Sequence, residues 1–542
     1  MRNVSTFGSF TTARLGIYAA QKGLEVTGNN MTNINTTGYT RQRLDQMSFV
    51  SGGPDYYAVP MGTKVGNGVI TTGVSQLRDP FLDIAYRNAN TNVGQADTKL
   101  AWLEQVAGVL DEVGKGSDDN GLLYKQMQDV IDAVNQMITE GAGHKEYDAL
   151  VRTAAQGLTD LFNTYAKGLE QKKENLETSL KQDVETVNGL LKNIQELNDS
   201  IRKADVRGDS ALELRDQRNL ALDELSNYMK IEVSYEMEDV GSGTMVEKLV
   251  VKVADMKDDK GNPIKLVDGK YVTQAEVVGD RYQIQLGELK DRFGKDTPNK
   301  QNTQILGETL QGSLQASRDM LNGKGEFSSE ADIKADSNAT TKRGIPYYQK
   351  SLDLLANRFA KIMNDANKPA GNPGGNLFSN SSEGNNATGI TAANISISHK
   401  WSTGETKLQC SADPNAPASA TDNLAHILAE LTGKGHEFKP EFVAADAESK
   451  VPLFTGSFQD MFLNIQGVLG NDIKNTAVVL NSYATTLDEV YVDRDSISGV
   501  DLNEEATNMM QYQKAYSAAC RLMTTLDQAL DKLINGTGVV GL

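Results

Sequence analysis

The sequence predicts a mainly helical protein with β-rich inserts, in which paired, coiled-coil-like terminal helices adjoin a long helical bundle. Three observations predict this fold class. No proline occurs within 81–262 or 453–542, so both stretches can hold long helices. Apolar residues step by three and four along separate segments, as on the buried face of a helix. A region that begins at Ile231 alternates apolar and polar residues instead, as half-buried strands do.

The first predicted helix carries a heptad seam. Its seam positions are Phe10, Ala13, Ile17, Ala20, Leu24, Thr27, Met31 and Ile34. A 3.5-residue period sustained over four heptads is typical of a coiled-coil helix. A single seam needs a partner, and the simplest partner is the other end of the chain. The alternative is that this is an ordinary core helix of a globular domain.

The interior divides into helical segments and inserts. Helical spacing recurs within 180–201, 352–362 and 462–490, which predicts a bundle of three separated segments. Two alternating runs with turn residues between them predict a β-rich insert. A stretch rich in Gly, Asn, Ser and Thr predicts a second insert of loops and short strands. The four predicted units are 1–45 with 498–542, 46–230 with 301–374 and 451–497, 231–300, and 375–450.

The last predicted helix carries a matching seam, which only Glu505 interrupts. Its members are Leu502, Met509, Tyr512, Tyr516, Ala519, Met523, Leu526, Leu530 and Leu533. The acidic run 501–505 opens this helix, where negative charge favours the helix dipole. A salt bridge between subunits explains those acids about as well.

The amino-acid composition argues against several classes of function. With 54 basic and 72 acidic residues the net charge is −18, which argues against nucleic-acid binding. Two cysteines and four histidines disfavour a cysteine-based zinc site or a disulfide framework. No run is long enough for membrane insertion, and the short apolar stretch 15–20 does not resemble a signal peptide. We therefore expect a chain that stays in the cytosol or leaves by a route without a cleaved signal.

Catalytic motifs are lacking as well. The sequence contains no zinc-protease, nucleophile-elbow or phosphate-loop pattern. We expect no catalytic residue, no cofactor, no metal site and no enzyme activity. Carboxylates in the two inserts leave an enzyme open as an alternative.

Residues 21–42 carry the most informative motif and read QKGLEVTGNNMTNINTTGYTRQ. Asparagines followed by Gly38 can end a helix and redirect the chain, and they place Tyr39 just past the turn. The stretch resembles the N-terminal signature of bacterial flagellar axial proteins, the family of rod, hook and hook-associated proteins. Residues 39–42 are similar to the hook-associated members. Thr37 departs from the pattern, because relatives often carry proline there, and we expect a softer turn.

Other segments carry the same resemblance. Residues 498–506, followed by 512–516, are similar to the C-terminal signature of the hook-associated members. Residues 214–218 and 223–226 resemble a family stretch that closes the helical region. The inserts match nothing familiar.

The resemblance implies a structural, self-assembling adaptor that joins the hook to the filament as a ring in the extracellular flagellum. It implies export through the flagellar type III pathway. It also implies that the terminal helices line the inner tube, that the bundle surrounds them and that the inserts face outward. The implied partners are further copies of the chain, the hook protein, a second junction protein on the filament side, and an export chaperone acting around 509–533. Alternatives are a hook or distal rod subunit, or a cytosolic coiled-coil scaffold.

The terminal seams are the candidate site. We expect the free termini to be disordered or chaperone-covered before assembly, because lone amphipathic helices expose apolar surface. The N-terminal assembly seam comprises Ile17, Ala20, Leu24, Asn29, Asn30, Met31, Asn33, Ile34, Asn35, Gly38 and Tyr39. The C-terminal assembly and chaperone seam comprises Leu502, Met509, Tyr512, Tyr516, Met523, Leu526, Leu530 and Leu533.

Overall fold

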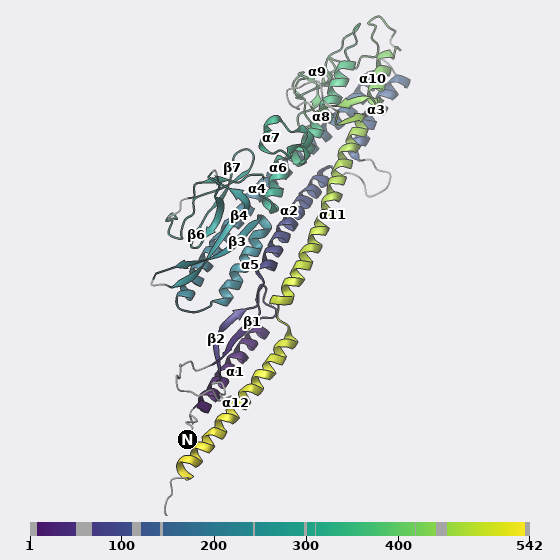
Figure 1. Ribbon diagram of the computed structural model, residues 1–542. Coiled ribbons are helices and arrows are strands. Elements are labelled where there is room, and N and C mark those ends of the chain that lie inside the picture. The colour runs from purple at the N-terminus through teal and green to yellow at the C-terminus, as the bar shows by residue number, and fades with distance from the viewer. Residues whose placement is uncertain are drawn as a thin grey trace, which may run out of the picture.

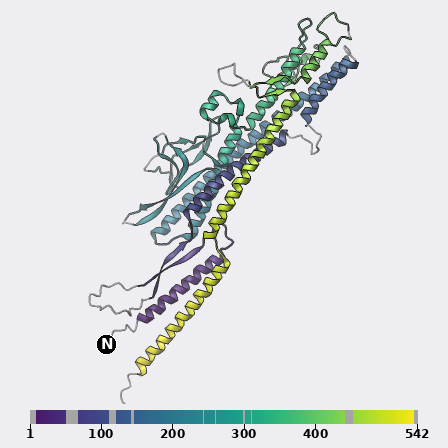
Figure 2. The ribbon, with the colours of Figure 1, turned by 45° about the vertical axis from the view of Figure 1, so that its right-hand side comes forward.

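The chain forms a long rod of helices with sheets attached along one side (Figures 1 and 2). The computed structural model describes residues 8–49, 68–110, 121–140, 145–241, 244–258, 260–297, 301–308, 310–417, 419–440 and 452–536. At one end of the rod, α1 (Gly8–Thr32) lies beside α12 (Leu502–Gly536). Parts of the predicted terminal units, 1–7 and 537–542, lie outside the described residues, as does 441–450 of the second insert.

The middle of the rod is the predicted bundle of long helices. Its main members are α2 (Pro80–Leu110), α4 (Lys145–Val206), α5 (Leu212–Tyr228), α6 (Gly312–Asn322), α8 (Ile345–Ala366) and α11 (Phe458–Ser498). Helix α4 alone has 62 residues, which corresponds to about 90 Å at 1.5 Å per residue. Helices α3 (Leu122–Glu140) and α10 (Asp422–Thr432) pack at the far end. Among described residues, no helix is long and apolar enough to cross a bilayer.

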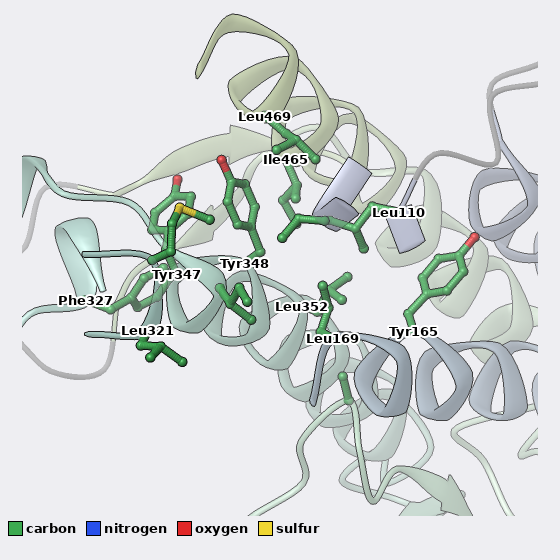
Figure 3. Packing of buried hydrophobic residues seen from close by; sticks show 14 of the residues in the cluster. Leu110, Tyr165, Leu169, Leu321, Phe327, Tyr347, Tyr348, Leu352, Ile465 and Leu469 are labelled. Atoms are coloured by element: carbon green, nitrogen blue, oxygen red, sulfur yellow. The ribbon is translucent and has the colours of Figure 1, made fainter. Parts of the chain in front are cut away.

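The bundle has a continuous apolar core (Figure 3). Tyr165 and Leu169 of α4, Leu352 of α8, and Ile465 and Leu469 of α11 all lie in it. The predicted apolar row of α4 from 180 to 194 is also enclosed. The helical spacing in the sequence therefore marks the buried faces of the bundle helices.

Two antiparallel sheets occupy the first predicted insert. The strands are β3 (Ile231–Asp239), β4 (Met245–Lys257), β5 (Pro263–Asp268) and β6 (Tyr271–Val272), then β7 (Ala275–Val278), β8 (Gln283–Leu286) and β9 (Gln304–Ile305). In the β3–β4 pair, Ile231 opposes Val253 and Val233 opposes Val251. Strands β4 and β7 lie against α4. The β-rich insert of the predicted fold class is confirmed.

The second predicted insert contains more helix than the sequence indicated. It holds β10 (Phe378–Ser379), β11 (Ser396–Ile397), the short α9 (His399–Ser402), α10 and β12 (His436–Phe438). β12 pairs with β13 (Phe454–Gly456), and Trp401 is fully enclosed. The exact division of the chain into four units stays a prediction.

Candidate assembly site

The terminal helices form an antiparallel pair that meets at glycines. A Cβ added at Gly16 would touch Cβ of Ala519 at 3.6 Å, and one at Gly23 would lie 2.5 Å from the Tyr512 ring. The ring of Tyr512 therefore rests on backbone that only glycine leaves open. The two helices approach more closely here than a seam of large apolar side chains allows.

The buried face of α1 is turned by one residue from the predicted heptad seam. Ala13, Ala20 and Thr27 are buried as the heptad predicts. Between them, Gly23 and Asn30 are buried, whereas Leu24 and Met31 are only half-buried. Because the two helices approach closely at the glycines, the residues of α1 that are buried there are the smaller ones.

Further seam positions differ from a simple coiled-coil pair. Ile34 lies beyond the end of α1 and is 39% exposed. On α12, Met509, Tyr512, Met523, Leu526 and Leu530 are half-buried, while Leu502, Tyr516 and Leu533 are exposed. Ile17 is half-buried as well. The partner helix within one chain therefore covers the seams only in part.

The asparagine motif fastens the end of α1 to the chain that returns from it. Asn30 is buried; its Oδ1 accepts hydrogen bonds from the Tyr39 hydroxyl at 2.9 Å and the Gln42 amide at 3.0 Å. Its Nδ2 donates to the Gln42 carbonyl at 2.9 Å. Asn33 Nδ2 donates at 3.0 Å to the Asn29 carbonyl in the last turn of the helix, which also accepts from the Asn33 amide at 3.2 Å. The side chain of Asn30 thus joins helix and strand as a backbone group would.

Gly38 makes the turn possible. Its φ is +77°, a conformation that glycine adopts without strain, and it lies against Leu220 of α5. The chain then enters β1 (Gln42–Ser48), which pairs with β2 (Val69–Gln76). Asn35 is exposed beside this turn. The turn thus directs the segment after it onto the bundle.

Arg41 connects that segment to the start of α12. Its amide donates to the Ser498 carbonyl at 2.8 Å, and its Nε donates to Glu505 at 2.8 Å. A second nitrogen of the guanidinium pairs with Glu504. Glu505 is 2% exposed, so the residue that interrupts the heptad seam is a buried acid with an arginine partner. The acidic run therefore makes salt bridges within the chain, in addition to opening the helix.

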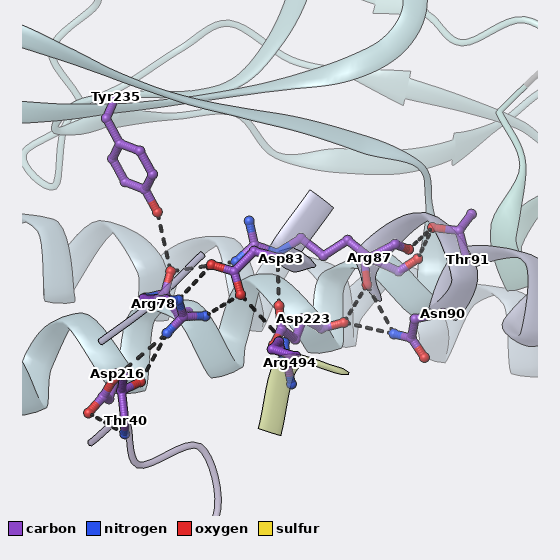
Figure 4. Close-up of polar contacts among 12 residues, drawn as sticks. Thr40, Arg78, Asp83, Arg87, Asn90, Thr91, Asp216, Asp223, Tyr235 and Arg494 are labelled. Atoms are coloured by element: carbon purple, nitrogen blue, oxygen red, sulfur yellow. Dashed lines mark hydrogen bonds and ion pairs between the residues drawn. The ribbon is translucent and has the colours of Figure 1, made fainter. Parts of the chain in front are cut away.

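A series of ion pairs connects the region around Arg41 to the bundle (Figure 4). Arg78 donates to Asp83 at 2.6 and 2.9 Å. Asp223 of α5 accepts from Arg87 of α2 at 2.8 Å and from Arg494 of α11 at 2.7 Å. Helices far apart in sequence thus share a single carboxylate.

Together these groups form what we call the junction network: Asn30, Tyr39, Arg41, Arg78, Asp83, Arg87, Asp216, Asp223, Arg494 and Glu505. It ties the terminal pair to α2, α5 and α11. Removing one partner of such a buried pair leaves the other charge without compensation, which costs about 3–5 kcal/mol. The network therefore fixes the position of the terminal pair on the rod.

Asp216 and Tyr39 are titratable groups of the network whose pKa values are clearly raised. Burial raises its pKa to about 6, although the Thr40 amide donates to it at 3.1 Å and Arg78 stands 3.8 Å away. Burial also raises the pKa of Tyr39, and the charges of Glu213, Asp216 and Glu505 act in the same direction. Asp216 therefore binds a proton more readily than an exposed carboxylate does.

Sequence reasoning found part of this site. It singled out Asn30, Gly38 and Tyr39, which the structure brings together at the turn, but omitted the ion pairs beneath them. A signal was present, since Asp83, Arg87 and Thr91 recur every four residues on α2 and all three are buried. Polar residues at helical spacing mark a buried polar stripe in the same way as apolar ones mark a core.

A second polar cluster offers no metal site. Carboxylate oxygens of Glu308, Asp319 and Asp336 lie within 4.8 Å of one another beside a cavity of about 980 Å³. Lys342 pairs with Asp319 and Asp336, each at 2.8 Å, and Arg318 pairs with Glu308 at 2.7 Å. Each of the three carboxylates therefore already has a cationic partner, although the two cations balance only two of the three charges.

Two family models match the chain. The model of the "Flagellar hook-associated protein FlgK helical domain" matches residues 109–378. The model of the "Flagellar basal body rod FlgEFG protein C-terminal" matches residues 494–536, which include all of α12. The first match spans part of the bundle and the β-rich insert, and the second spans the end of α11 and all of α12.

Full-length relatives are similar over the whole chain. Identity to flagellar hook-associated protein 1 of Bacillus subtilis (strain 168) is 30%, covering 99% of both chains. Identity to flagellar hook-associated protein 1 of Escherichia coli (strain K12) is 24%, covering 96% of this chain and 98% of that one. The solved flagellar hook junction protein FlgK from Burkholderia pseudomallei is a more distant likeness, with a TM-score of 0.39 and 20% identity over 55% of this chain and 47% of that one.

Proposed function

The chain belongs to the flagellar hook-associated protein 1 family and is a structural component of the flagellum, and on that premise we propose that it assembles as a ring that joins the hook to the filament. Likeness over nearly the full length to relatives of that name supports this role. It favours the junction over the hook or distal rod alternatives, because the matched helical-domain model covers α4, α5, α6 and α8 of the bundle.

The observation that carries the proposal is the incomplete cover of the terminal seams. In one chain, Leu526 and Leu530 stay half-buried, and Leu533 is 56% exposed. Contiguous exposed apolar faces mark surfaces that bind a partner. Neighbouring copies around a tube would cover both flanks of each terminal pair.

Export and partners are part of the same proposal. The chain would leave the cell through the flagellar type III pathway, with a chaperone covering 509–533 until assembly. The hook protein and a second junction protein would contact the ring from its two sides. The inserts would face outward, and the seam residues named from the sequence would line the contacts between copies.

The double substitution of Leu526→Asp with Leu530→Asp tests the proposal. We expect the bundle to keep its unfolding midpoint, while the variant fails to enter flagella in cells that lack the wild-type chain. A matched control places aspartate at Thr525 and Gln528, which are exposed on the same turns of α12. Normal filaments from the leucine variant would contradict the proposal.

The location of the wild-type chain tests the remaining alternative. Immunogold labelling of sheared appendages should place the chain between hook and filament. A cytosolic scaffold would be absent from those appendages. Substituting Ile17 and Leu24 by aspartate should abolish labelling and leave the helical signal of the bundle unchanged.

A further inference from the structure

We propose that the β-rich insert of one subunit docks, through a basic pocket, on the acidic segment 481–498 of α11 in the neighbouring subunit. This inference rests on the ring of the proposed function and adds the surfaces that meet between copies. The basic pocket comprises Arg202, Lys203, Arg207, Lys270, Arg292 and Phe293.

The basic pocket gathers positive charge that its own acids do not balance. It is a hollow of about 510 Å³ between the end of α4 and two loops of the insert. Five cations line it against only two acids, Asp199 and Asp291, in a chain of net charge −18. Asp199 stands 3.3 Å from Arg292 and 4.0 Å from Lys203, and Glu238, outside the lining, stands 3.9 Å from Arg202. The carboxylate of Asp291 is used within its own turn, where it accepts two backbone amides at 2.9 Å.

The end of a helix explains only some of these cations. Basic side chains near the C-terminus of α4 favour its dipole, which accounts for Arg202, Lys203 and Arg207. Lys270 and Arg292 come from separate loops of the insert. Phe293 beside them is 75% exposed, with the Arg292 guanidinium 4.6 Å from its ring. A projecting aromatic within a cationic rim is typical of a protein interface.

The segment of α11 from 481 to 498 is the complementary surface. Asp488, Glu489 and Asp493 are exposed there, and Tyr491 and Val492 between them are 49% and 62% exposed. Arg494 is the only basic residue of the segment, and it turns inward to Asp223. Its outer surface therefore offers negative charge together with apolar side chains for Phe293.

The two surfaces lie on opposite sides of α5, within a few helical turns of each other along the rod. Arg218 of α5 donates to Asn198 near the end of α4, and Asp223 of α5 accepts from Arg494 of α11. Five residues of α5 separate those contacts, about 7.5 Å along its axis. The sheets lie on one side of the rod and α11 on the other (Figures 1 and 2). Contacts between opposite faces are of the head-to-tail type that closes a ring.

Charge reversal with rescue tests the docking. Arg202→Glu with Arg292→Glu, or Asp488→Lys with Asp493→Lys, should each lower the copies incorporated per flagellum by roughly tenfold, because like charges then face each other. The chain that carries all four changes should return to within about twofold of the wild type. Lys257→Glu, an exposed change on the same insert, serves as the control.

Cysteine cross-linking gives an independent result. Arg292→Cys and Asp493→Cys, in a chain whose Cys410 and Cys520 are serine, should form dimers and larger ladders in isolated flagella when a thiol cross-linker is added. Normal incorporation of both single-sided variants, or no recovery in the four-change chain, would overturn the docking. The absence of ladders, with incorporation intact, would do the same. Immunogold labelling of the wild-type chain tests separately whether it lies between hook and filament. Failure of the proposed function can therefore be distinguished from failure of the docking.

Discussion

The terminal pair and the bundle are both helical, yet they bury their side chains to very different degrees. In the bundle, Phe359, Phe462 and Leu352 are enclosed almost completely. In α12, over its described length Leu502–Gly536, Glu505 is the one buried residue. The bundle therefore completes its core within one chain. The terminal pair leaves apolar side chains of α12 exposed, which other copies would cover in the proposed ring.

The two regions also differ in the interactions that hold each of them in place. Shared apolar burial stabilises the bundle, whose core runs through helices of several segments. The terminal pair has two close glycine contacts and a polar connection at its base. A region fastened by few specific contacts can be released without unfolding the rest. The following predictions separate the two regions, from the largest expected effect to the smallest.

A cavity in the bundle should have the largest effect. Phe462→Ala removes a fully buried ring that stacks on Tyr165 at a centroid distance of 6.5 Å. We expect a loss of about 3–5 kcal/mol in the free energy of unfolding, measured by urea titration of the helical signal. The matched truncation Tyr516→Ala on α12, where the ring is 38% exposed, should cost less than about 1 kcal/mol. Equal losses would remove the distinction between the regions.

Protonation of Asp216 should have the next largest effect. Its pKa is near 3.8 when unfolded and about 6 when folded, so the folded chain binds the extra proton. The stability from this group is fully present below pH 4 and is lost as the pH rises through about 6, by at most about 3 kcal/mol.

Asp216→Asn should therefore flatten the dependence of unfolding free energy on pH between 4 and 7. The asparagine carbonyl can still accept from the Thr40 amide. Asp132→Asn, on an exposed face of α3, is the control and should keep the wild-type profile. If the Asp216 variant keeps that profile as well, this carboxylate does not titrate with folding.

Overpacking of the terminal pair should affect that pair alone. Gly23→Leu places a side chain where the Tyr512 ring lies, at a cost of about 1–3 kcal/mol to the pairing. Hydrogen exchange should show faster exchange in α1 and α12, with α4 and α8 unchanged. Gly28→Ala is the control, since nothing lies within 4 Å of the added Cβ. Loss of protection throughout the bundle would show that the two regions unfold as one.

Local opening of the termini should involve the smallest free-energy difference, and limited proteolysis measures it. We expect cleavage of the free chain first in the segments up to Thr40 and from Gly499 on, because partial opening there costs only a fraction of the global unfolding energy. Mass analysis should then show a stable middle fragment. Equal resistance of both ends would indicate that the pair is complete in the monomer and that no neighbour is needed.

The sequence by itself determined what depends on nearby residues. Apolar spacing of three and four marked the bundle helices, and alternation marked β3 and β4, because helix and strand periods are local properties. The asparagines and Gly38 marked the end of α1 and its turn for the same reason. The terminal pairing was also expected, since each seam lacked any other partner.

Only the tertiary structure decided which distant groups meet. Arg41 pairs with Glu505 across 464 positions, and Arg494 reaches Asp223 across 271. No period in the sequence encodes such a distance, because the path of the whole chain determines it. The rotation of the α1 seam toward Gly23 also depends on the ring of Tyr512 opposite. Local patterns therefore set the elements, and the packing of those elements set the junction network.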